Sequence, residues 1–380
     1  MKTCSCPLCS KGNYDPSEFQ VDLSKLKRKR PIGVSGLIRV KDGARWLAQS
    51  IDTCIGALDE LIICYQESTD ETAAIVEQKR QQYPDKIKAY FYAPPVYAHS
   101  LTEEDFWYAY HLPKDSIHLL SNYYNYTLSK ATYRYAMKID ADQLYFTDRL
   151  LKLCDAYRGI EDYKFSLKEC IAYNWGRIFF KLCRCFYWSI KIMDKLPSYG
   201  IIMEMYRSYI YRLVHKNKIS VSLSGINLYR DREGWGVPVF TKGCELPLVF
   251  NGCGDLFVFE VSDQSFYIPF YQSPKESDQS DSIKWNPGYN VYRIIENFHY
   301  DSKIVHGGFF WYHMKFIDVY EFDKKPISLG ACYNDLKNMK IETLFKSGLI
   351  KNTKYYFIPH LFFFKYDKDL PYPEKIVRNL

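Results

Sequence analysis

The chain has 380 residues and a formal net charge of +7, and 47% of its residues are hydrophobic, which is enough for a sizeable core in one large or two ordinary domains. No stretch is long and uncharged enough to predict a membrane-spanning helix. No motif typical of RNA- or DNA-binding proteins is present, so we expect no nucleic-acid partner. Aromatic residues make up 17% of the chain, with 35 tyrosines and 24 phenylalanines, a composition that suits grooves in which sugars stack on rings.

Residues 1–30 predict an N-terminal tail, because they are polar, cysteine-bearing and basic with little periodicity. No apolar signal segment opens the chain, and 12 cysteines are scattered along it, which indicates a reduced, cytosolic protein. Cys4, Cys6 and Cys9 have the C-x-C-x2-C spacing of half a zinc site, but no second half with suitable spacing follows. The basic run KLKRKR at 25–30 fits either a solvated linker or a segment that contacts an anionic surface.

Residues 31–150 alternate between strand and helix patterns. Apolar runs predict strands at 31–40, 60–65, 86–92 and 133–139, and apolar residues at helical spacing predict helices at 44–58, 68–84 and 116–131. Ser68 and Glu71 have capping-box spacing at the start of the second helix, and the aromatic stretch EEDFWYAYH is expected in a loop. This alternation predicts an α/β fold with a mostly parallel, Rossmann-like sheet flanked by helices.

The second half, residues 151–320, is less regular. Its segment 178–218 is basic and amphipathic, and the apolar run 178–196 fits an interfacial helix with snorkelling cations as well as it fits a core helix. A strand is expected at 219–231, a polar loop at 273–282 and a C-terminal extension at 321–380. We therefore expect a helical, membrane-associating C-terminal part.

Asp140 and Asp142 directly follow the fourth predicted strand, in the stretch KIDADQLYF. Ligands of parallel sheets bind at the carboxyl ends of the strands, and buried carboxylates need a partner or a metal. Hard cations such as Mn²⁺ or Mg²⁺ take carboxylate and phosphate oxygens together, so the pair predicts a cation that holds a nucleotide diphosphate. The alternative is a solvated turn at the strand end. A second D-x-D, at Asp367 and Asp369, has no predicted sheet before it.

Other enzyme classes with alternating folds lack their motifs here. A Rossmann dehydrogenase requires G-x-G-x-x-G after the first strand, and a sugar nucleotidyltransferase requires a glycine-rich phosphate loop there, whereas LIRVKDGARW has a single glycine. A dehalogenase-type phosphatase carries its acids after the first strand, not after the fourth.

Four segments, in order, resemble the donor domain of inverting GT-A glycosyltransferases of family 2: GLIRVKDGARWLAQSID, CYQESTDETAAIVEQKRQQYP, SNYYNYTLSKA and MKIDADQLY. The likeness covers residues 33–150 and is nearest to the bacterial lipooligosaccharide β-1,4-N-acetylgalactosaminyltransferases. It implies that residues 31–150 form a GT-A half that binds a UDP-sugar donor, and that residues 151–320 form an acceptor-binding and catalytic half. The implied enzyme moves a hexose or N-acetylhexosamine with inversion.

The resemblance also implies roles for individual residues. Gln66 stands where the family often has an acid that meets the uracil, and it offers an amide instead. The residues implied in binding the nucleotide sugar are Arg39, Lys41, Asp42, Gln66, Asp70, Asn125 and Asp140. The implied ligands of a Mn²⁺ or Mg²⁺ ion are Asp142 with Asp140, and His313 of FFWYHMK with His306 as second choice. A histidine buried in the core is the alternative for the last two.

The segment NGCGDLFVFE is similar to the glycine-rich segment that carries the family's catalytic acid, which implies Asp255 as general base and Glu260 as second choice. The implied acceptor is a lipid-linked oligosaccharide of lipooligosaccharide core, O-antigen or capsule. The enzyme would then be cytoplasmic and peripheral to the anionic inner-membrane surface. The alternative function is a non-catalytic glycan-binding or scaffolding protein on a degenerate GT-A fold.

Overall fold

The computed structural model describes most of the chain, namely residues 6–159, 164, 166–185, 199–231, 234–240, 250–251, 257–274, 283–285, 291–300, 304–317, 329–338 and 364–377. The chain forms two units that are interleaved along the sequence. The first comprises residues 1–51, 58–141 and 259–302, and the second comprises residues 52–57, 142–258 and 303–380. Segments far apart in the sequence therefore complete each unit.

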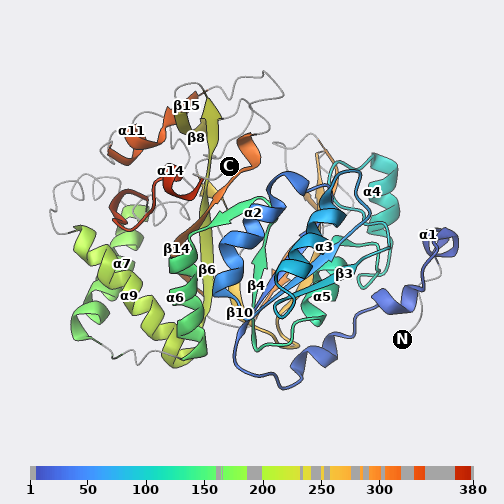
Figure 1. Cartoon of the computed structure of the whole chain (residues 1–380), viewed down its shortest axis with the longest axis horizontal. Coiled ribbons are helices and arrows are strands. Elements are labelled where there is room, and N and C mark those ends of the chain that lie inside the picture. The colour runs from blue at the N-terminus through green and yellow to red at the C-terminus, as the bar shows by residue number, and fades with distance from the viewer. Residues whose placement is uncertain are drawn as a thin grey trace. The chain divides into compact units, whose positions relative to one another are not determined.

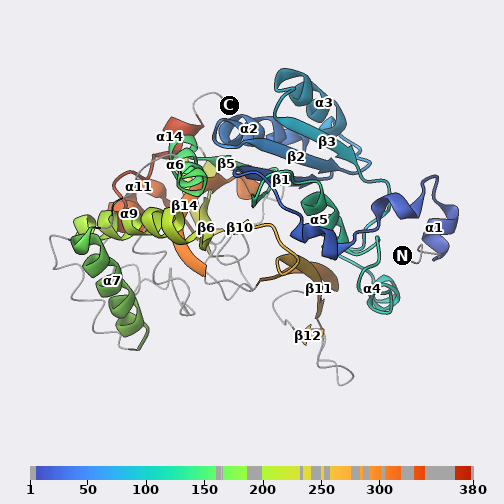
Figure 2. The same ribbon diagram turned by 90° about the horizontal axis from the view of Figure 1, so that it is seen from below.

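A parallel sheet forms the centre of the first unit. Its strands are β1 (Val34–Val40), β2 (Glu60–Tyr65), β3 (Ile87–Phe91) and β4 (Tyr135–Ile139), in the order β3-β2-β1-β4. Helices α2 (Ala44–Cys54) and α3 (Thr72–Gln82) cover one face, and α5 (Leu120–Ser129) covers the other (Figures 1 and 2). Strands β1, β2 and β4 are buried on both faces, which explains their continuous apolar runs, whereas β3 at the edge of the sheet is mostly half-buried. The predicted α/β alternation is confirmed.

Two local expectations in this unit are wrong. Helix α3 begins at Thr72 because Asp70, rather than a Ser68–Glu71 capping box, accepts a hydrogen bond of 3.0 Å from the Thr72 amide. The aromatic stretch expected in a loop forms α4 (Glu103–Tyr110), which is capped by the hydroxyl of Thr102. Phe106 of this helix is fully buried, so packing stabilises a segment whose periodicity was too short to indicate a helix.

The N-terminal segment packs against the first unit, so its description as a tail is wrong. It forms α1 (Pro7–Lys11) and the 3₁₀ helices η1 (Pro16–Phe19) and η2 (Leu23–Lys27). Phe19 is buried with its ring 5.1 Å from that of Tyr92. In the basic run, Arg28 and Arg30 both donate to the carbonyl of Ala131, at 2.9 and 3.1 Å. These two arginines therefore hold the segment to the unit.

A second, three-stranded sheet completes the first unit from residues that come much later in the chain. It consists of β12 (Ile283–Trp285), β11 (Phe266–Ser273) and β13 (Arg293–His299), in that order. Strand β11 lies against α5, and its residue Tyr271 shares a buried cluster with Phe106 of α4. Lys138 of β4 and Glu296 of β13 form a buried ion pair of 2.8 Å that joins the two sheets.

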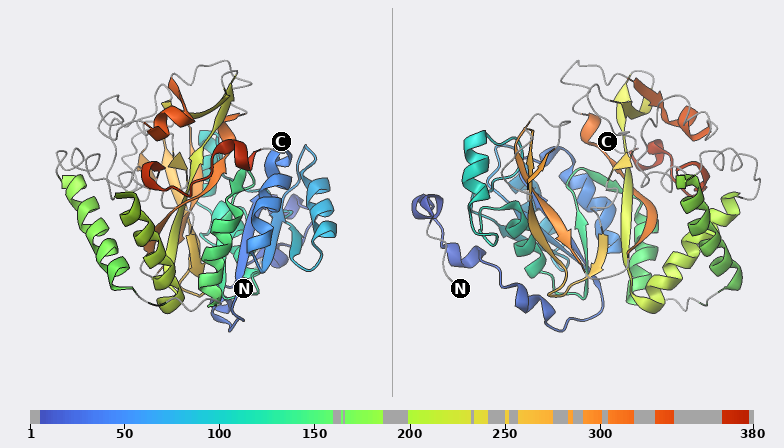
Figure 3. Two further views of the ribbon diagram at one scale, coloured as in Figure 1. Left: turned by 60° about the vertical axis from the view of Figure 1, so that its left-hand side comes forward. Right: turned by 180° about the vertical axis from the view of Figure 1, so that it is seen from behind.

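The second unit combines helices with mixed β-structure. Helices α7 (Leu167–Cys185) and α9 (Tyr199–Asn217) lie side by side (Figure 3), joined by an ion pair of 2.8 Å between Arg212 and Glu169, and α6 (Thr147–Arg158) contacts α9. In the part of the chain that the structure describes, no helix has the length and apolar character needed to span a bilayer.

Strands make up much of this unit. Strand β6 (Ser220–Asn227) pairs with β14 (Ile304–His313) in parallel, and β14 pairs with β5 (Gln143–Tyr145) antiparallel. β9 (Phe250–Asn251) and β10 (Phe257–Glu260) pair with β6 antiparallel. A small sheet has the order β15 (Leu329–Cys332), β8 (Gly234–Phe240), β7 (Tyr229–Asp231). Short helices α11 (Tyr333–Asn338) and α14 (Pro373–Ile376) follow. The expected strand at 219–231 is confirmed as β6 and β7, and the part of the chain expected to be helical combines α6, α7 and α9 with these strands.

Candidate functional site

The loops that follow β1 and β2 are hydrogen-bonded to each other. The carboxylate of Asp42 accepts from the amide of Thr69 at 2.7 Å and from its hydroxyl at 3.1 Å, and the Asp42 amide donates to the Ser68 hydroxyl at 3.1 Å. Asp42 has a φ of +50°, in the left-handed region that few non-glycine residues occupy. These contacts fix both loops at the carboxyl edge of the sheet, where ligands of parallel sheets bind.

Asp70 secures the starts of two helices. One carboxylate oxygen accepts from the amide of Ala44 at 2.9 Å, and the other accepts from the amide and hydroxyl of Thr72. Desolvation raises the pKa of Asp70, but these hydrogen bonds outweigh it and the net pKa is lowered. Lys41 is exposed on the same loop. Contact of Lys41, Asp42 or Asp70 with a nucleotide stays a prediction.

Arg39, near the end of β1, has a buried guanidinium with donors that no acceptor uses among the described residues. Its side chain is 3% exposed, its Nη1 donates to the carbonyl of Leu37 at 3.1 Å, and its Cζ lies 3.8 Å from the ring centroid of Tyr124. Its Nη2 lies 3.9 Å from Oδ1 of Asp140, which is beyond hydrogen-bond distance. Among the described residues, no acceptor reaches Nε or Nη2. A ligand oxygen within hydrogen-bond distance of Nε or Nη2 would satisfy these two donors.

Gln66 and Asn125 both have amide groups that bind backbone. Nε2 of Gln66 donates to the carbonyl of Pro94 at 3.0 Å. Nδ2 of Asn125 donates to the carbonyl of Tyr267, and Oδ1 accepts from the Tyr267 amide, both at 2.8 Å. Asn125 thus holds β11 to α5. The nucleotide contacts implied for Gln66 and Asn125 stay predictions.

The D-x-D acids fall on either side of the division between the units, since Asp140 belongs to the first and Asp142 to the second. Within the second unit, Oδ2 of Asp142 lies 3.1 Å from Nε2 of His313. Strand pairing fixes this approach, because β5 pairs with the end of β14 and the amide of Met314 donates to the Asp142 carbonyl at 2.9 Å. The structure thus brings together two of the predicted metal ligands.

Asn227 orients the imidazole of His313. Its Oδ1 lies 2.6 Å from Nδ1 of His313, because the two residues are partners in the parallel pairing of β6 and β14. A carbonyl oxygen only accepts, so Nδ1 carries a proton and Nε2 faces Asp142. Burial raises the pKa of Asp142, but His313 outweighs this effect and the net pKa is lowered. A carboxylate beside an oriented imidazole fits a divalent cation, and the nitrogen ligand favours Mn²⁺ over Mg²⁺.

The remaining predicted residues do not join this cluster. His306 pairs with Ser222 near the start of β14, whereas His313 ends that strand. Glu260 forms a half-exposed ion pair of 2.9 Å with Arg134, which precedes β4, whereas Asp140 follows it. The structure thus places Glu260 at the amino end of β4, away from the edge where a donor would bind. Asp255 lies outside the described residues.

The second D-x-D is an ion-pair cluster in the second unit. Asp367 is buried and accepts from Arg149 at 2.7 Å and from Arg207 at 2.5 Å, and Asp369 also pairs with Arg207. Two arginines therefore neutralise Asp367.

Comparison with known proteins agrees with the resemblance seen in the sequence. Residues 11–185 match the family model described as β-1,4-N-acetylgalactosaminyltransferase (CgtA). No curated protein matches the sequence significantly.

Solved structures similar to the chain include two of glucosyl-3-phosphoglycerate synthase from Mycobacterium tuberculosis, one with Mn²⁺, UDP and glucosyl-3-phosphoglycerate and one with Mn²⁺, UDP and phosphoglyceric acid. Each is 16% identical with a TM-score of 0.18, over 32% of this chain and 37% or 36% of the other. The match thus spans little more than a third of the synthase. TarS 1–349 of S. aureus is 11% identical with a TM-score of 0.29, over 86% of this chain and 72% of the other. The likeness to the β-1,4-N-acetylgalactosaminyltransferase family is thus carried by residues 11–185, a segment that includes all four strands of the parallel sheet.

Proposed function

We propose that the protein is an inverting glycosyltransferase that moves a hexose or N-acetylhexosamine from a UDP-sugar to a lipid-linked bacterial surface glycan. The observation that carries this proposal is the approach of Asp142 and His313, with Asn227 behind the imidazole. This pair combines a carboxylate at a D-x-D with a pre-oriented nitrogen ligand, which is what a metal-assisted transfer from a nucleotide diphosphate requires.

Within the first unit, the proposed contacts of the donor are those of the predicted nucleotide loops. Arg39 offers two buried donors to oxygens of the nucleotide, and the hydrogen bonds of Asp42 and Asp70 hold the surrounding loops in place. Within the second unit, Asp142 and His313 would hold a divalent cation, which would supply positive charge to stabilise a departing diphosphate. Asn227 keeps the imidazole oriented for this task, so the ligands need no rearrangement when the cation binds.

In the proposed reaction, the acceptor hydroxyl oxygen attacks the anomeric carbon while the bond from that carbon to the diphosphate breaks. The hydroxyl proton passes to a carboxylate, which we assign to Asp255. A carboxylate is competent for this role when it lies within hydrogen-bond distance of the attacking oxygen. Gly252 and Gly254 before it lack side chains that would obstruct an acceptor. UDP leaves as the second product.

A membrane surface is the proposed location of the acceptor. On α7, four large apolar side chains recur at helical spacing and are exposed: Leu167, Ile171, Trp175 and Ile178. Exposed Lys168 and Arg177 lie on the same helix and would meet anionic headgroups. Ile178 begins the basic segment 178–218, whose side chains from 179 to 199 lie outside the described residues. An apolar stripe flanked by cations is typical of helices that lie in the interface of an anionic bilayer.

Vesicle sedimentation tests this location. We expect the protein to bind phosphatidylglycerol vesicles at low salt, and binding to weaken as salt rises, because surface attraction is screened. Ile171→Asp with Ile178→Asp should abolish binding, whereas Leu151→Asp on α6, where Leu151 is also exposed, should not. Equal binding by both variants would exclude α7 as the docking helix.

Release of UDP tests the transferase activity itself. The protein is incubated with Mn²⁺, a panel of UDP-hexoses and UDP-N-acetylhexosamines, and lipid-linked oligosaccharide acceptors. We expect UDP release with one donor, loss of release in Asp142→Asn, and full release in the matched Asp369→Asn variant, because Asp369 belongs to the ion-pair cluster. A folded protein that binds a UDP-sugar and releases no UDP would favour the non-catalytic glycan-binding alternative.

A further inference from the structure

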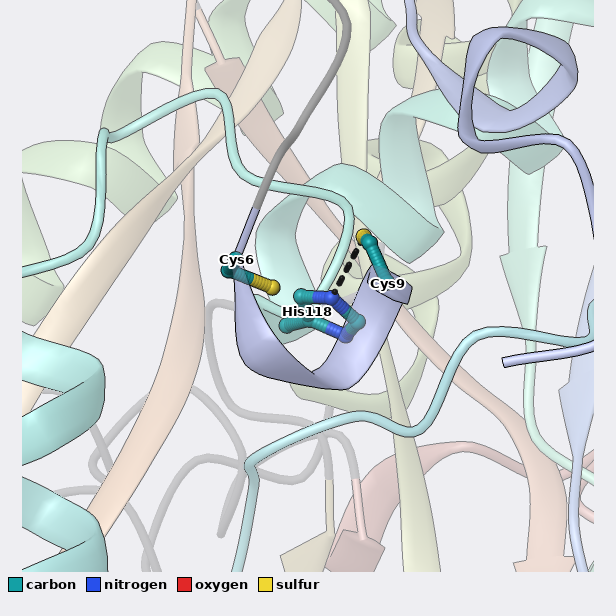
Figure 4. A group of neighbouring side chains, drawn as sticks. All are labelled: Cys6, Cys9 and His118. Carbon is teal, nitrogen blue, oxygen red and sulfur yellow. Dashed lines mark hydrogen bonds between the residues drawn. The ribbon is translucent and has the colours of Figure 1, made fainter. Parts of the chain in front are cut away.

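Two cysteines of the N-terminal helix meet a histidine from a distant loop (Figure 4). Cys6 is the N-cap of α1, and Cys9 lies in its first turn, so the sequence CPLC gives the two-residue spacing of a zinc knuckle. His118 precedes α5 and is fully buried. The two sulfur atoms and one nitrogen of this group lie within 4.8 Å of one another. Among the cysteine, histidine, aspartate and glutamate residues that the structure describes, Cys6, Cys9 and His118 form the one group of three whose ligand atoms lie close enough together to hold a metal ion.

The hydrogen bonds of His118 prepare it as a ligand. Its Nδ1 lies 2.8 Å from the carbonyl of Pro95, which can only accept, so Nδ1 carries the proton. Nε2 therefore presents its lone pair, and it lies 3.1 Å from Sγ of Cys9, which donates its thiol proton. Burial lowers the pKa of His118, which agrees with a neutral ring. A backbone carbonyl that fixes the distal nitrogen is the usual outer support of a metal-binding histidine.

We propose that Cys6, Cys9 and His118 bind a zinc ion that fastens α1 to the loop before α5. Two thiols release their protons, two sulfur–zinc bonds and one nitrogen–zinc bond form, and a water or one further side chain completes the tetrahedron. Ligand atoms of tetrahedral zinc lie about 3.5 to 3.8 Å apart, given bonds of about 2.3 Å to sulfur and 2.0 Å to nitrogen. The present separations reach that geometry with shifts of about 1 Å. Thiolate with imidazole is a ligand set that selects zinc over Mg²⁺ or Mn²⁺.

The site and the predicted donor loop are hydrogen-bonded to two adjacent residues, Pro95 and Pro94. His118 contacts the carbonyl of Pro95, and Gln66 donates to the carbonyl of Pro94. A bound zinc would therefore hold Pro94 and Pro95 in place through His118. Gln66, the residue implied near the uracil, donates to this segment. Weaker UDP binding after loss of the zinc is a consequence that rests on the proposed function, whereas the zinc site itself does not.

Metal content and cobalt spectroscopy on the full chain test the proposal. The wild-type protein, purified without chelator, should retain one equivalent of zinc more than the variants Cys6→Ser, Cys9→Ser and His118→Gln. Substitution with Co²⁺ should give thiolate-to-metal charge-transfer absorption in the wild type and not in the cysteine variants. This absorption distinguishes the site from Asp142 and His313, which supply no sulfur.

Two substitutions outside the cluster serve as matched controls. Cys170→Ser on α7 and His111→Gln after α4 should leave the zinc content and the cobalt spectrum unchanged. Removing zinc from the wild type should lower its melting temperature, and adding zinc back should restore it, so the proposal is tested even if a variant folds poorly. Wild-type zinc content in Cys9→Ser, no zinc in the wild type, or a Cys6–Cys9 disulfide in protein purified under reducing conditions would each overturn the proposal.

Discussion

Nε2 of His313 lies 3.1 Å from Oδ2 of Asp142, although 171 residues separate them in the chain. Strand β14 makes this approach possible, because its last residue pairs with Gln143 of β5 on one side and with Asn227 of β6 on the other. The end of β14 therefore places His313 beside Asp142, which precedes Gln143, and beside Asn227, which orients its ring.

The orienting role of Asn227 predicts a defect in metal affinity. Without its amide, the His313 ring loses the hydrogen bond that directs Nε2 toward Asp142. Loss of such an outer partner typically lowers metal affinity by about 10- to 100-fold. Calorimetry of Asn227→Ala should show weaker Mn²⁺-dependent UDP binding, with unchanged binding in Asp369→Asn. If the wild type binds UDP equally well with EDTA and with Mn²⁺, the metal assignment is wrong.

Arg39 is expected to contribute to donor affinity through its two buried donors. A hydrogen bond to a charged group contributes about 1.5–3 kcal/mol, so Arg39→Gln should raise the dissociation constant for the UDP-sugar by about 10- to 100-fold. Lys114, an exposed lysine outside the predicted nucleotide loops, provides the control, and Lys114→Gln should have a much smaller effect. Equilibrium dialysis with labelled UDP-sugar measures both. An unchanged affinity in folded Arg39→Gln would show that these donors do not meet the nucleotide.

Asp255 and Glu260 are distinguished by substitution. Loss of a general base typically lowers the rate by about 10²–10⁴-fold, so Asp255→Asn should lower kcat to that extent and leave UDP-sugar affinity nearly unchanged. Glu260→Gln removes only the half-exposed pair with Arg134, and we expect kcat near that of the wild type. Initial rates per folded molecule provide the comparison. A folded Asp255→Asn enzyme with normal kcat would exclude Asp255 as the base.

The Asp367 cluster predicts a component of acid instability. Burial raises the pKa of Asp367, but Arg149 and Arg207 outweigh it, so the folded pKa lies below the ordinary value of 3.8. A carboxyl group with a lowered folded pKa stabilises the protein above its unfolded pKa, and this stability is lost as the pH falls through the folded pKa. Urea unfolding should therefore show a free energy of unfolding that is constant near neutrality and declines below about pH 4.

Substitution at this cluster separates the buried acid from its exposed neighbour. Asp367→Asn leaves two arginines without their buried partner, and breaking such a pair costs about 3–5 kcal/mol at neutral pH. The decline below pH 4 should then be shallower. Asp369 is 67% exposed, so Asp369→Asn should change the unfolding free energy by less than about 1 kcal/mol. Identical pH profiles for Asp367→Asn and the wild type would contradict the assignment.

The parallel sheet was predictable from the sequence, because each of its strands is a local apolar run and each crossover has its own helix period. The place of Asp142 just after a strand was predictable for the same reason, whereas its role as a metal ligand stays a prediction. Asn227 and the Cys6–Cys9–His118 cluster were not predictable, because 86 residues separate Asn227 from His313 and 109 separate Cys9 from His118. Only tertiary pairing brings them together. The helix α4 was missed because it depends on burial against strands made from residues 266–299.

The two hydrogen bonds between the Asn125 side chain and the Tyr267 backbone, which hold β11 to α5, have a consequence for protein synthesis. The ribosome must add more than a hundred residues after α5 before β11 and β13 exist to cover it. Until then, the apolar face of α4 lacks the strands against which it packs, and Lys138 lacks its ion-pair partner Glu296. A nascent chain halted near residue 185, where the family match ends, would expose this apolar surface. Such an intermediate is a substrate for chaperones, so the matched half alone should express as an aggregating fragment.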